Sequence, residues 1–259
     1  MQRDLNIALV QYDIEWQDIA SNLRKLDVFF NTLSCPVDLI VLPEMFLTGF
    51  TMKPQGLAVE MRGPEIDWMR AKAAKYDALV LGSLIVREDG QYFNRCVLAY
   101  PDGTISYQDK RHLFSYAGEE KVFTPAKTRK VFEWRGWTLF CAVCYDLRFP
   151  VWSRNDLGYD LLIYVANWPK VRVDAWRRLL VARAIENQSY VIGVNRVGKD
   201  GNGLIYDGHS AVLDFQGDSL VSASNNEVIL YAKASRQALL DYRARYRFLD
   251  DKDAFGIRL

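Results

Sequence analysis

The sequence predicts an α/β fold, a four-layer α-β-β-α sandwich in which two mixed sheets form the core and helices lie outside. Strand-like and helix-like segments alternate along all 259 residues, as they do in α/β domains. Several strand segments are apolar on both faces, which indicates that both sides are buried. Turn signals such as Asp89-Gly90 join neighbouring strands into hairpins, which excludes a purely parallel sheet. Periodicity alone does not separate this two-sheet core from a single mixed doubly wound sheet.

Composition limits the classes of protein to which the chain can belong. Half of the residues are hydrophobic and the formal net charge is +1, so there is no charge footprint for nucleic acid or an anionic membrane. No apolar run reaches the roughly 20 residues that span a bilayer, and we expect no signal peptide. Four cysteines without disulfide or metal spacing indicate a reducing cytoplasm. No linker divides the chain, so residues 1–259 are expected to form a single domain.

Apolar residues at helical spacing predict the helices. They recur every three or four positions from Ile19 to Leu33, which predicts an amphipathic helix over 18–33. A short helix is expected to begin within 149–155, because Pro150 suits a first helical turn. The other helices are expected at 64–76, 174–188 and 237–246.

Runs of apolar and β-branched residues bounded by turn signals predict the strands. A loop is expected at 199–203. The strands are expected at 5–12, 38–43, 78–86, 92–100, 104–110, 130–134, 137–144, 160–167, 190–197, 209–215, 219–223 and 227–232.

Cys144 ends one of these apolar strands, just before the helix expected at 149–155. Reacting groups in α/β folds lie at such strand ends, and the positive end of a following helix favours the thiolate. We therefore interpret Cys144 as a nucleophile. The alternative is an inert packing residue, the commonest role of a free cysteine and the one that fits Cys35, Cys96 and Cys141. A redox pair of Cys141 with Cys144 is disfavoured, because the residues between them belong to a strand.

Two other strands also end in a reactive side chain. Glu44 follows the strand at 38–43, and Lys110 ends the strand at 104–110. Each is weak evidence alone, since a lone glutamate or lysine is usually a surface residue. Together with Cys144 they supply a nucleophile, a base and a donor for an oxyanion.

These segments resemble the carbon–nitrogen hydrolase (nitrilase) superfamily, and the resemblance runs from Leu5 to about Gly217. The phrases at 107–114 and 164–169 are closest to its omega-amidase branch, which includes the bacterial YafV-like proteins. The resemblance implies a Glu44-Lys110-Cys144 catalytic set. The matching stretches are LPEMF at 42–46, DKRHLF at 109–114, CYDLRFP at 144–150, ANWP at 166–169 and ARAIENQ at 182–188.

The family also has a second glutamate after the lysine strand. Alignment places it at Glu119, with Glu120 as the adjacent alternative. The glycine that usually lies seven residues beyond it is Ala126 here, so both positions stay open.

The implied mechanism follows from residue chemistry. Glu44 takes the thiol proton, Cys144 attacks the amide carbon, and Lys110 with the backbone N–H of Tyr145 stabilises the oxyanion. No cofactor or metal is implied. The chain has two histidines, and His112 is interpreted as a packing or hydrogen-bonding residue rather than a base.

Omega-amidases hydrolyse the terminal amide of α-keto acid amides such as 2-oxoglutaramate and 2-oxosuccinamate. The far carboxylate of such a substrate calls for an arginine fork, and the candidates are Arg172 and Arg148. The alternative for Arg148 is a salt bridge to Asp146 or Glu186. Phe46, Tyr145 and Trp168 are expected to wall the pocket, with a plain core role as the alternative for each.

The partner expected from the resemblance is a small-molecule amide, with neither nucleic acid nor membrane. Family members pair into homodimers or higher homo-oligomers, and residues 247–259 look like a C-terminal arm that reaches a neighbour; a disordered end is the alternative. Rival functions are another amidase, a nitrilase, an N-carbamoyl hydrolase, or a catalytically silent scaffold.

Overall fold

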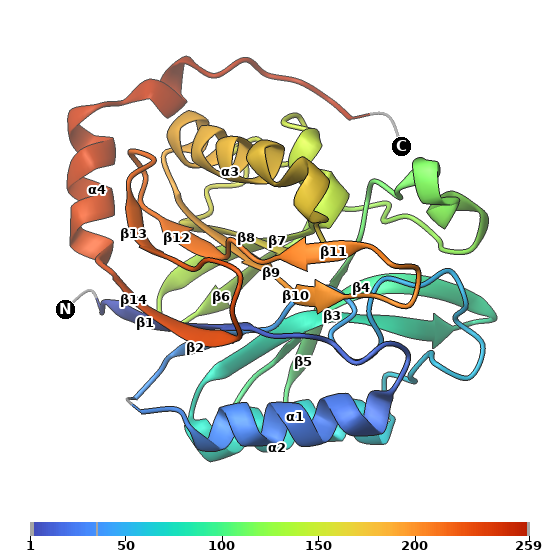
Figure 1. The fold of residues 1–259 in the computed structure, drawn as a ribbon. Coiled ribbons are helices and arrows are strands. Elements are labelled where there is room, and N and C mark those ends of the chain that lie inside the picture. Colours follow the sequence, from blue (N-terminus) through green and yellow to red (C-terminus); the bar gives the residue numbers. More distant parts are fainter. Residues whose placement is uncertain (1–2, 35, 258–259) are drawn as a thin grey trace.

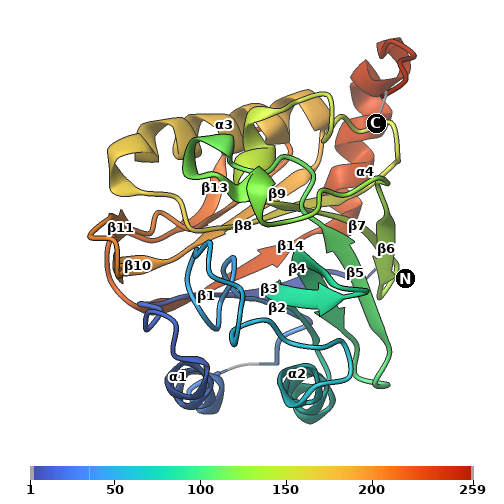
Figure 2. The ribbon, with the colours of Figure 1, turned by 90° about the vertical axis from the view of Figure 1, so that its right-hand side faces the viewer.

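The computed structural model of the chain describes residues 3–34 and 36–257. Two six-stranded sheets lie face to face, with α1 and α2 outside one sheet and α3 outside the other (Figure 1). Figure 2 shows the same layers with α1 and α2 viewed along their axes. The predicted four-layer α-β-β-α sandwich is thereby confirmed, and the single doubly wound sheet is excluded.

The first sheet has the strand order β14-β1-β2-β3-β4-β5. Its central strands run parallel, and β4, β5 and β14 are antiparallel to their neighbours. Its strands are β1 (Leu5–Gln11), β2 (Leu39–Val41), β3 (Leu79–Glu88), β4 (Gln91–Ala99), β5 (Ile105–Asp109) and β14 (Val228–Ala234).

The second sheet has the order β13-β12-β9-β8-β7-β6, again with a parallel centre, β7-β8-β9, and antiparallel flanks. A separate hairpin joins β10 (Val197–Lys199) to β11 (Ile205–Asp207). The strands of the sheet are β6 (Val131–Trp134), β7 (Trp137–Val143), β8 (Leu161–Ala166), β9 (Tyr190–Asn195), β12 (Ala211–Leu213) and β13 (Ser219–Ser222).

Three apolar layers hold the sandwich together. One lies between the sheets, one between the first sheet and helices α1 (Ile19–Asn31) and α2 (Pro64–Tyr76), and one between the second sheet and α3 (Val173–Asn187). A fourth helix, α4 (Arg236–Arg245), lies beside the sheets (Figure 1). The centres of both sheets are therefore buried on both faces, which explains the apolar runs in the sequence.

Local signals set the helix ends where the sequence predicts them. The Asp18 side chain accepts the Ser21 N–H and caps α1, and Pro64 occupies the first turn of α2. Gly193 of β9 lets α3 approach closely, because a Cβ there would lie 2.5 Å from Leu180 Cδ1. The two helix starts and the close contact at Gly193 together fix the helices that cover the sheets.

The helix predicted within 149–155 is wrong. A short 3-10 helix, η3 (Cys144–Arg148), begins at the cysteine itself, and residues 150–153 form turns. The reason is that the Asp146 side chain accepts the Val143 N–H at 3.0 Å and closes the turn immediately. The chain then reverses at Asn155, which is buried and hydrogen-bonded to Tyr159 and Asn187.

The strand predicted over 190–197 also ends early, at Asn195. The Asn195 side chain donates to the carbonyls of Trp168 and Gly208, and the chain leaves the sheet there. The loop expected at 199–203 is the tip of the β10–β11 hairpin. This hairpin contributes residues to the rim of the cavity described below.

The C-terminal segment lies along its own chain in this structure. It forms a short turn, η5 (Phe248–Asp251), and then crosses the α3 side of the molecule (Figure 1). Ile257 packs against the apolar layer under α3, and the Arg129 guanidinium lies 5.8 Å from the Phe255 ring centroid. Leu259, part of the expected arm, lies outside the described residues. Within the described ranges, no helix is both long and apolar enough to cross a membrane.

Candidate active site

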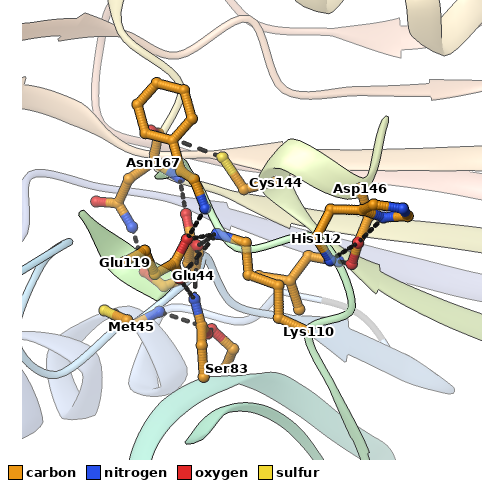
Figure 3. Close-up of polar contacts among 12 residues, drawn as sticks. Glu44, Met45, Ser83, Lys110, His112, Glu119, Cys144, Asp146 and Asn167 are labelled. Carbon is orange, nitrogen blue, oxygen red and sulfur yellow. Dashed lines mark hydrogen bonds and ion pairs between the residues drawn. The ribbon is translucent and has the colours of Figure 1, made fainter. Parts of the chain in front are cut away.

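Three strand ends meet in one place, although they are far apart in the sequence (Figure 3). Glu44 follows β2, Lys110 follows β5, and Cys144 follows β7 of the facing sheet. Lys110 Nζ lies 2.9 Å from Glu44 Oε1, and both side chains are at least 99% buried. Cys144 is half-buried, and its Sγ lies 3.9 Å from the Asn167 carbonyl oxygen. The carboxylate, ammonium and thiol singled out in the sequence are thus neighbours.

A second carboxylate completes the cluster. Glu119 lies in a 3-10 turn, η2 (Glu119–Lys121), and its Oε2 is 2.9 Å from Lys110 Nζ. Its side chain is buried and accepts the Phe114 N–H, whereas Glu120 is exposed. Of the two glutamates that the sequence leaves open, the structure places Glu119 in the cluster.

Neutral donors also hold the carboxylates, and sequence reasoning gave them no role. Asn94 Nδ2 donates to Glu44 Oε1 at 2.8 Å, and the Asn167 backbone N–H donates to Glu44 Oε2 at 2.8 Å. Asn167 belongs to a stretch already matched to the family. Asn94 lies within β4 with no local motif to mark it, so only the three-dimensional arrangement identifies it.

The backbone is strained at Cys144 and at Met45, the residue after Glu44. Cys144 has φ 46° and Met45 has φ 42°, a left-handed conformation that costs free energy for non-glycine residues. Asp146 fixes the turn after Cys144, because it accepts the backbone N–H of Val143 and also that of His112, at 2.7 Å. One buried carboxylate therefore ties the nucleophile turn to the segment that carries Lys110.

His112 lies beside the site and does not contact the thiol in the described hydrogen-bond network. Its Nδ1 is 2.8 Å from Asp146 Oδ1, and its ring stacks on Phe149 with centroids 3.8 Å apart. These contacts orient the segment after Lys110.

The charges and burial around Cys144 do not favour the thiolate that the sequence predicts. Burial raises the pKa of the Cys144 thiol well above its usual value, and the neighbouring charge of Glu44 raises it further. The charge of Lys110 opposes these effects without cancelling them, and no α-helix follows Cys144. These effects favour the thiol over the thiolate at Cys144.

Lys110 is held in its charged form. Burial alone lowers the pKa of an ammonium, but the charges of Glu119 and Glu44 outweigh it, and the pKa lies above the usual value. Burial raises the pKa of the Glu119 carboxyl, against the opposing effect of Lys110. Lys110 is accordingly a cationic donor and not a proton acceptor.

A cavity of about 690 Å³ opens onto the thiol and the ammonium. Tyr145, Arg148, Trp168 and Arg172 line it, as expected, and Phe50 contributes a ring 5.1 Å from Lys110 Nζ. Its remaining lining includes Trp16, Met52, Lys53, Phe114, Tyr116, Asn167, Val171, Leu204 and Tyr206.

Phe46 was expected to wall this cavity and does not. Its side chain is buried in the apolar layer under α1 and α2, with its ring 6.3 Å from that of Trp68. The cause is Gly82 of β3, where a Cβ would lie only 2.8 Å from Phe46 Cδ1. The absence of that Cβ opens a space in the core, and the Phe46 ring fills it.

The two candidate arginines lie on aromatic rings at the cavity. The Arg148 guanidinium is 4.9 Å from the Trp168 ring centroid, and that of Arg172 is 5.4 Å from the ring of Phe114. The salt bridge considered for Arg148 is not formed. Asp146 instead bonds to His112, and Glu186 pairs with Arg183.

Two of the other cysteines do not reach this cavity. Cys96 and Cys141 are buried in the layer between the sheets, and Cys35 lies outside the described residues. Among the residues that the structure describes, no three histidine, cysteine, aspartate or glutamate side chains are grouped to hold a metal ion.

Comparison with known proteins agrees with this geometry. The model of the carbon–nitrogen hydrolase family matches residues 6–244. The chain belongs to this family. As a carbon–nitrogen hydrolase, it hydrolyses carbon–nitrogen bonds other than peptide bonds.

Individual relatives span nearly the whole hydrolase. It is 47% identical to omega-amidase YafV of Yersinia enterocolitica, over 97% of this chain and 98% of the relative. It is 32% identical to a 2-oxoglutaramate amidase of Bacillus subtilis, over 95% and 96% of the two chains. The crystal structure of XC1258 from Xanthomonas campestris, a superfamily protein with an arsenic adduct in the active site, matches with a TM-score of 0.96 and 42% identity, covering 99% of this chain and 100% of the other.

The two adjacent glutamates give a matched test of the site. Glu119→Gln removes one of the two charges that hold Lys110, and we expect kcat for amide hydrolysis to fall by about a hundredfold or more. Glu120→Gln changes an exposed side chain and should leave kcat within about twofold of wild type. Steady-state ammonia release measures both. Equal effects of the two substitutions would contradict the placement of Glu119 in the site.

Proposed function

We propose that this hydrolase is an omega-amidase, which converts α-keto acid amides such as 2-oxoglutaramate and 2-oxosuccinamate into the dicarboxylate and ammonia through a cysteine thioester. The observation that carries the proposal is the buried Lys110, held between Glu44 and Glu119 beside Cys144. The similarity to an omega-amidase and to a 2-oxoglutaramate amidase over almost the full chain supports the substrate class.

The first half of the reaction forms the thioester. Glu44 accepts the Cys144 proton as the sulfur attacks the amide carbon, so the carbonyl oxygen becomes negatively charged. Lys110 and the Tyr145 N–H stabilise this oxyanion. Tyr145 lies in the first turn of η3, where backbone N–H groups lack partners within the helix. The tetrahedral intermediate collapses, the carbon–nitrogen bond breaks, and ammonia leaves with the proton from Glu44.

The second half releases the acid. Glu44, again a carboxylate, takes a proton from a water molecule that attacks the thioester carbon. The same two donors stabilise the second oxyanion, and the carbon–sulfur bond breaks as Glu44 returns its proton to the sulfur. Because Lys110 keeps its charge throughout, Glu44 alone carries the proton in both halves.

The cavity also suggests how the substrate is oriented. Lys110 and Cys144 line the cavity, and the buried Glu44 and Glu119 lie against Lys110, so the amide enters first and its carboxylate remains near the cavity wall that carries Arg148 and Arg172. Guanidinium groups bind carboxylates with two parallel hydrogen bonds. We propose Arg172 as the main carboxylate ligand, with Arg148, Tyr145 and Trp168 completing the wall.

A substrate panel tests the proposed function. We expect ammonia release from 2-oxoglutaramate to exceed that from an aliphatic nitrile or an N-carbamoyl amino acid by at least about a hundredfold in kcat/KM. Cys144→Ala should abolish it. Preference for the nitrile or the carbamoyl compound would favour those rival activities. No turnover, together with no labelling of Cys144 by iodoacetamide, would favour a silent scaffold.

A separate experiment tests Arg172 as the ligand of the substrate carboxylate. Arg172→Ala should raise KM for 2-oxoglutaramate by about tenfold or more, the size expected for a lost charged hydrogen bond, and should leave kcat/KM for propionamide unchanged. Arg148→Ala is the matched variant and should have the smaller effect. Equal losses on both amides would remove Arg172 from carboxylate recognition.

We also propose that the enzyme works in the cytoplasm as a homodimer or higher homo-oligomer, in keeping with its free cysteines and its family. Light scattering after size-exclusion chromatography should give at least twice the 29.9 kDa chain mass. Removal of residues 247–259 should shift the protein towards the monomer if this arm reaches a neighbour. A full-length protein with the mass of one chain would contradict the assembly.

A further inference from the structure

Asn94 connects the two carboxylates of the site directly. Its side chain is fully buried on β4, and Nδ2 donates to Glu44 Oε1 at 2.8 Å and to Glu119 Oε1 at 3.2 Å. These are the same two oxygen atoms that accept from Lys110 Nζ, at 2.9 and 3.1 Å. One neutral amide therefore provides the second bridge between the glutamates, alongside the ammonium.

The hydrogen-bond network determines which way the amide points. The Met45 N–H donates to Ser83 Oγ at 2.9 Å, so the Ser83 hydroxyl hydrogen is free to donate to Asn94 Oδ1 at 2.8 Å. Asn94 Oδ1 accepts that hydrogen bond, and its NH2 group must face the carboxylates. Ser83 is fully buried as well. The relay from Met45 leaves the amide no other orientation that satisfies every group.

The charge balance of the cluster indicates how the Asn94 amide affects the two carboxylates. Two carboxylates and one ammonium leave one uncompensated negative charge in a buried space, which favours uptake of a proton by one of the carboxylates. Hydrogen bonds that donate to the ionised form oppose that uptake. Asn94 supplies one such bond to each glutamate and adds no charge of its own.

The same bonds fix the geometry of Glu44. Lys110 and Asn94 occupy Oε1, and the Asn167 N–H occupies one side of Oε2. A carboxylate has about four lone-pair directions, so one direction on Oε2 remains. Cys144 lies near enough to Glu44 for the carboxylate charge to raise the pKa of the thiol. The network therefore leaves Glu44 a single free position from which to take the thiol proton.

We infer that Asn94 is a positioning residue for the reaction, which keeps Glu44 and Glu119 ionised together and directs the free lone pair of Glu44 at Cys144. This inference rests on the proposed role of Glu44 as the base. It assigns Ser83 the supporting role of orienting the Asn94 amide. Neither residue contacts the substrate carboxylate region of the cavity, so both act on kcat and its pH dependence rather than on substrate binding.

The test compares two buried asparagines with matched hydrogen bonding. Asn94→Leu removes both donors with little change in shape. Asn22→Leu is the control, because Asn22 Nδ2 also donates to two acceptors, the carbonyls of Glu15 and Leu47, and its Oδ1 also accepts one hydrogen bond, here from the Glu15 N–H, without contact to the catalytic cluster. The readouts are the pH profile of kcat/KM for 2-oxoglutaramate, the pH profile of Cys144 alkylation by iodoacetamide, and the melting temperature.

We expect Asn94→Leu to move the low-pH limb of both profiles upward by about one pH unit, because a carboxylate without its donor takes up a proton more easily. Asn22→Leu should lower the melting temperature and leave both limbs in place. If Asn94→Leu does not fold, Ser83→Ala carries the test, since it frees the amide to rotate and should move the limbs in the same direction by less.

The inference would be overturned by a folded Asn94→Leu or Ser83→Ala protein whose low-pH limbs stay within about 0.2 pH units of those of wild type. This holds whatever the melting temperature of the variant. The alkylation profile needs no substrate. If 2-oxoglutaramate is not turned over but the alkylation limb still shifts, the substrate assignment fails and the role of Asn94 stands.

Discussion

The interaction on which this structure depends is the ion pair of a fully buried ammonium with two buried carboxylates. Lys110 lies between Glu44 and Glu119, and removal of the ammonium from this buried site would leave two carboxylates without a counter-charge. The pairing keeps the lysine cationic and excludes it as the base. Because burial also raises the pKa of Cys144, the neutral thiol is favoured over the thiolate. Glu44 is therefore the residue that we propose as the base for the Cys144 thiol.

The arrangement of the two sheets brings the ammonium, the carboxylates and the thiol together. Glu44 and Lys110 extend from β2 and β5 of one sheet, and Cys144 extends from β7 of the other, so the cluster lies where the two sheets face each other. Apolar layers on both faces of each sheet hold the strands at fixed distances. The strained turns at Met45 and Cys144 are local costs that this rigid frame sustains.

Sequence reasoning located the parts whose signals are local. Strand ends, helix caps and hairpin turns predicted most elements, and three strand ends marked side chains that the structure brings together. It was wrong on the helix after Cys144, because the buried Asp146 side chain closes that turn and no periodicity reports it. It missed Asn94, because the role of this asparagine within a strand depends on hydrogen bonds to Glu44 and Glu119, which lie 50 and 25 positions away in the sequence. Phe46 was misplaced for a similar reason, since the space it fills is created by Gly82 of a different strand.

We propose that Cys144 is the nucleophile and that Glu44 of this charge cluster activates it. Rapid acid quench of the enzyme during turnover of 2-oxoglutaramate, followed by mass spectrometry of the intact protein and its peptides, tests this proposal. We expect a transient acyl adduct on the peptide that contains Cys144, absent from Cys144→Ala and from Glu44→Gln. Turnover without an adduct, or an adduct on Cys96 or Cys141, would contradict it.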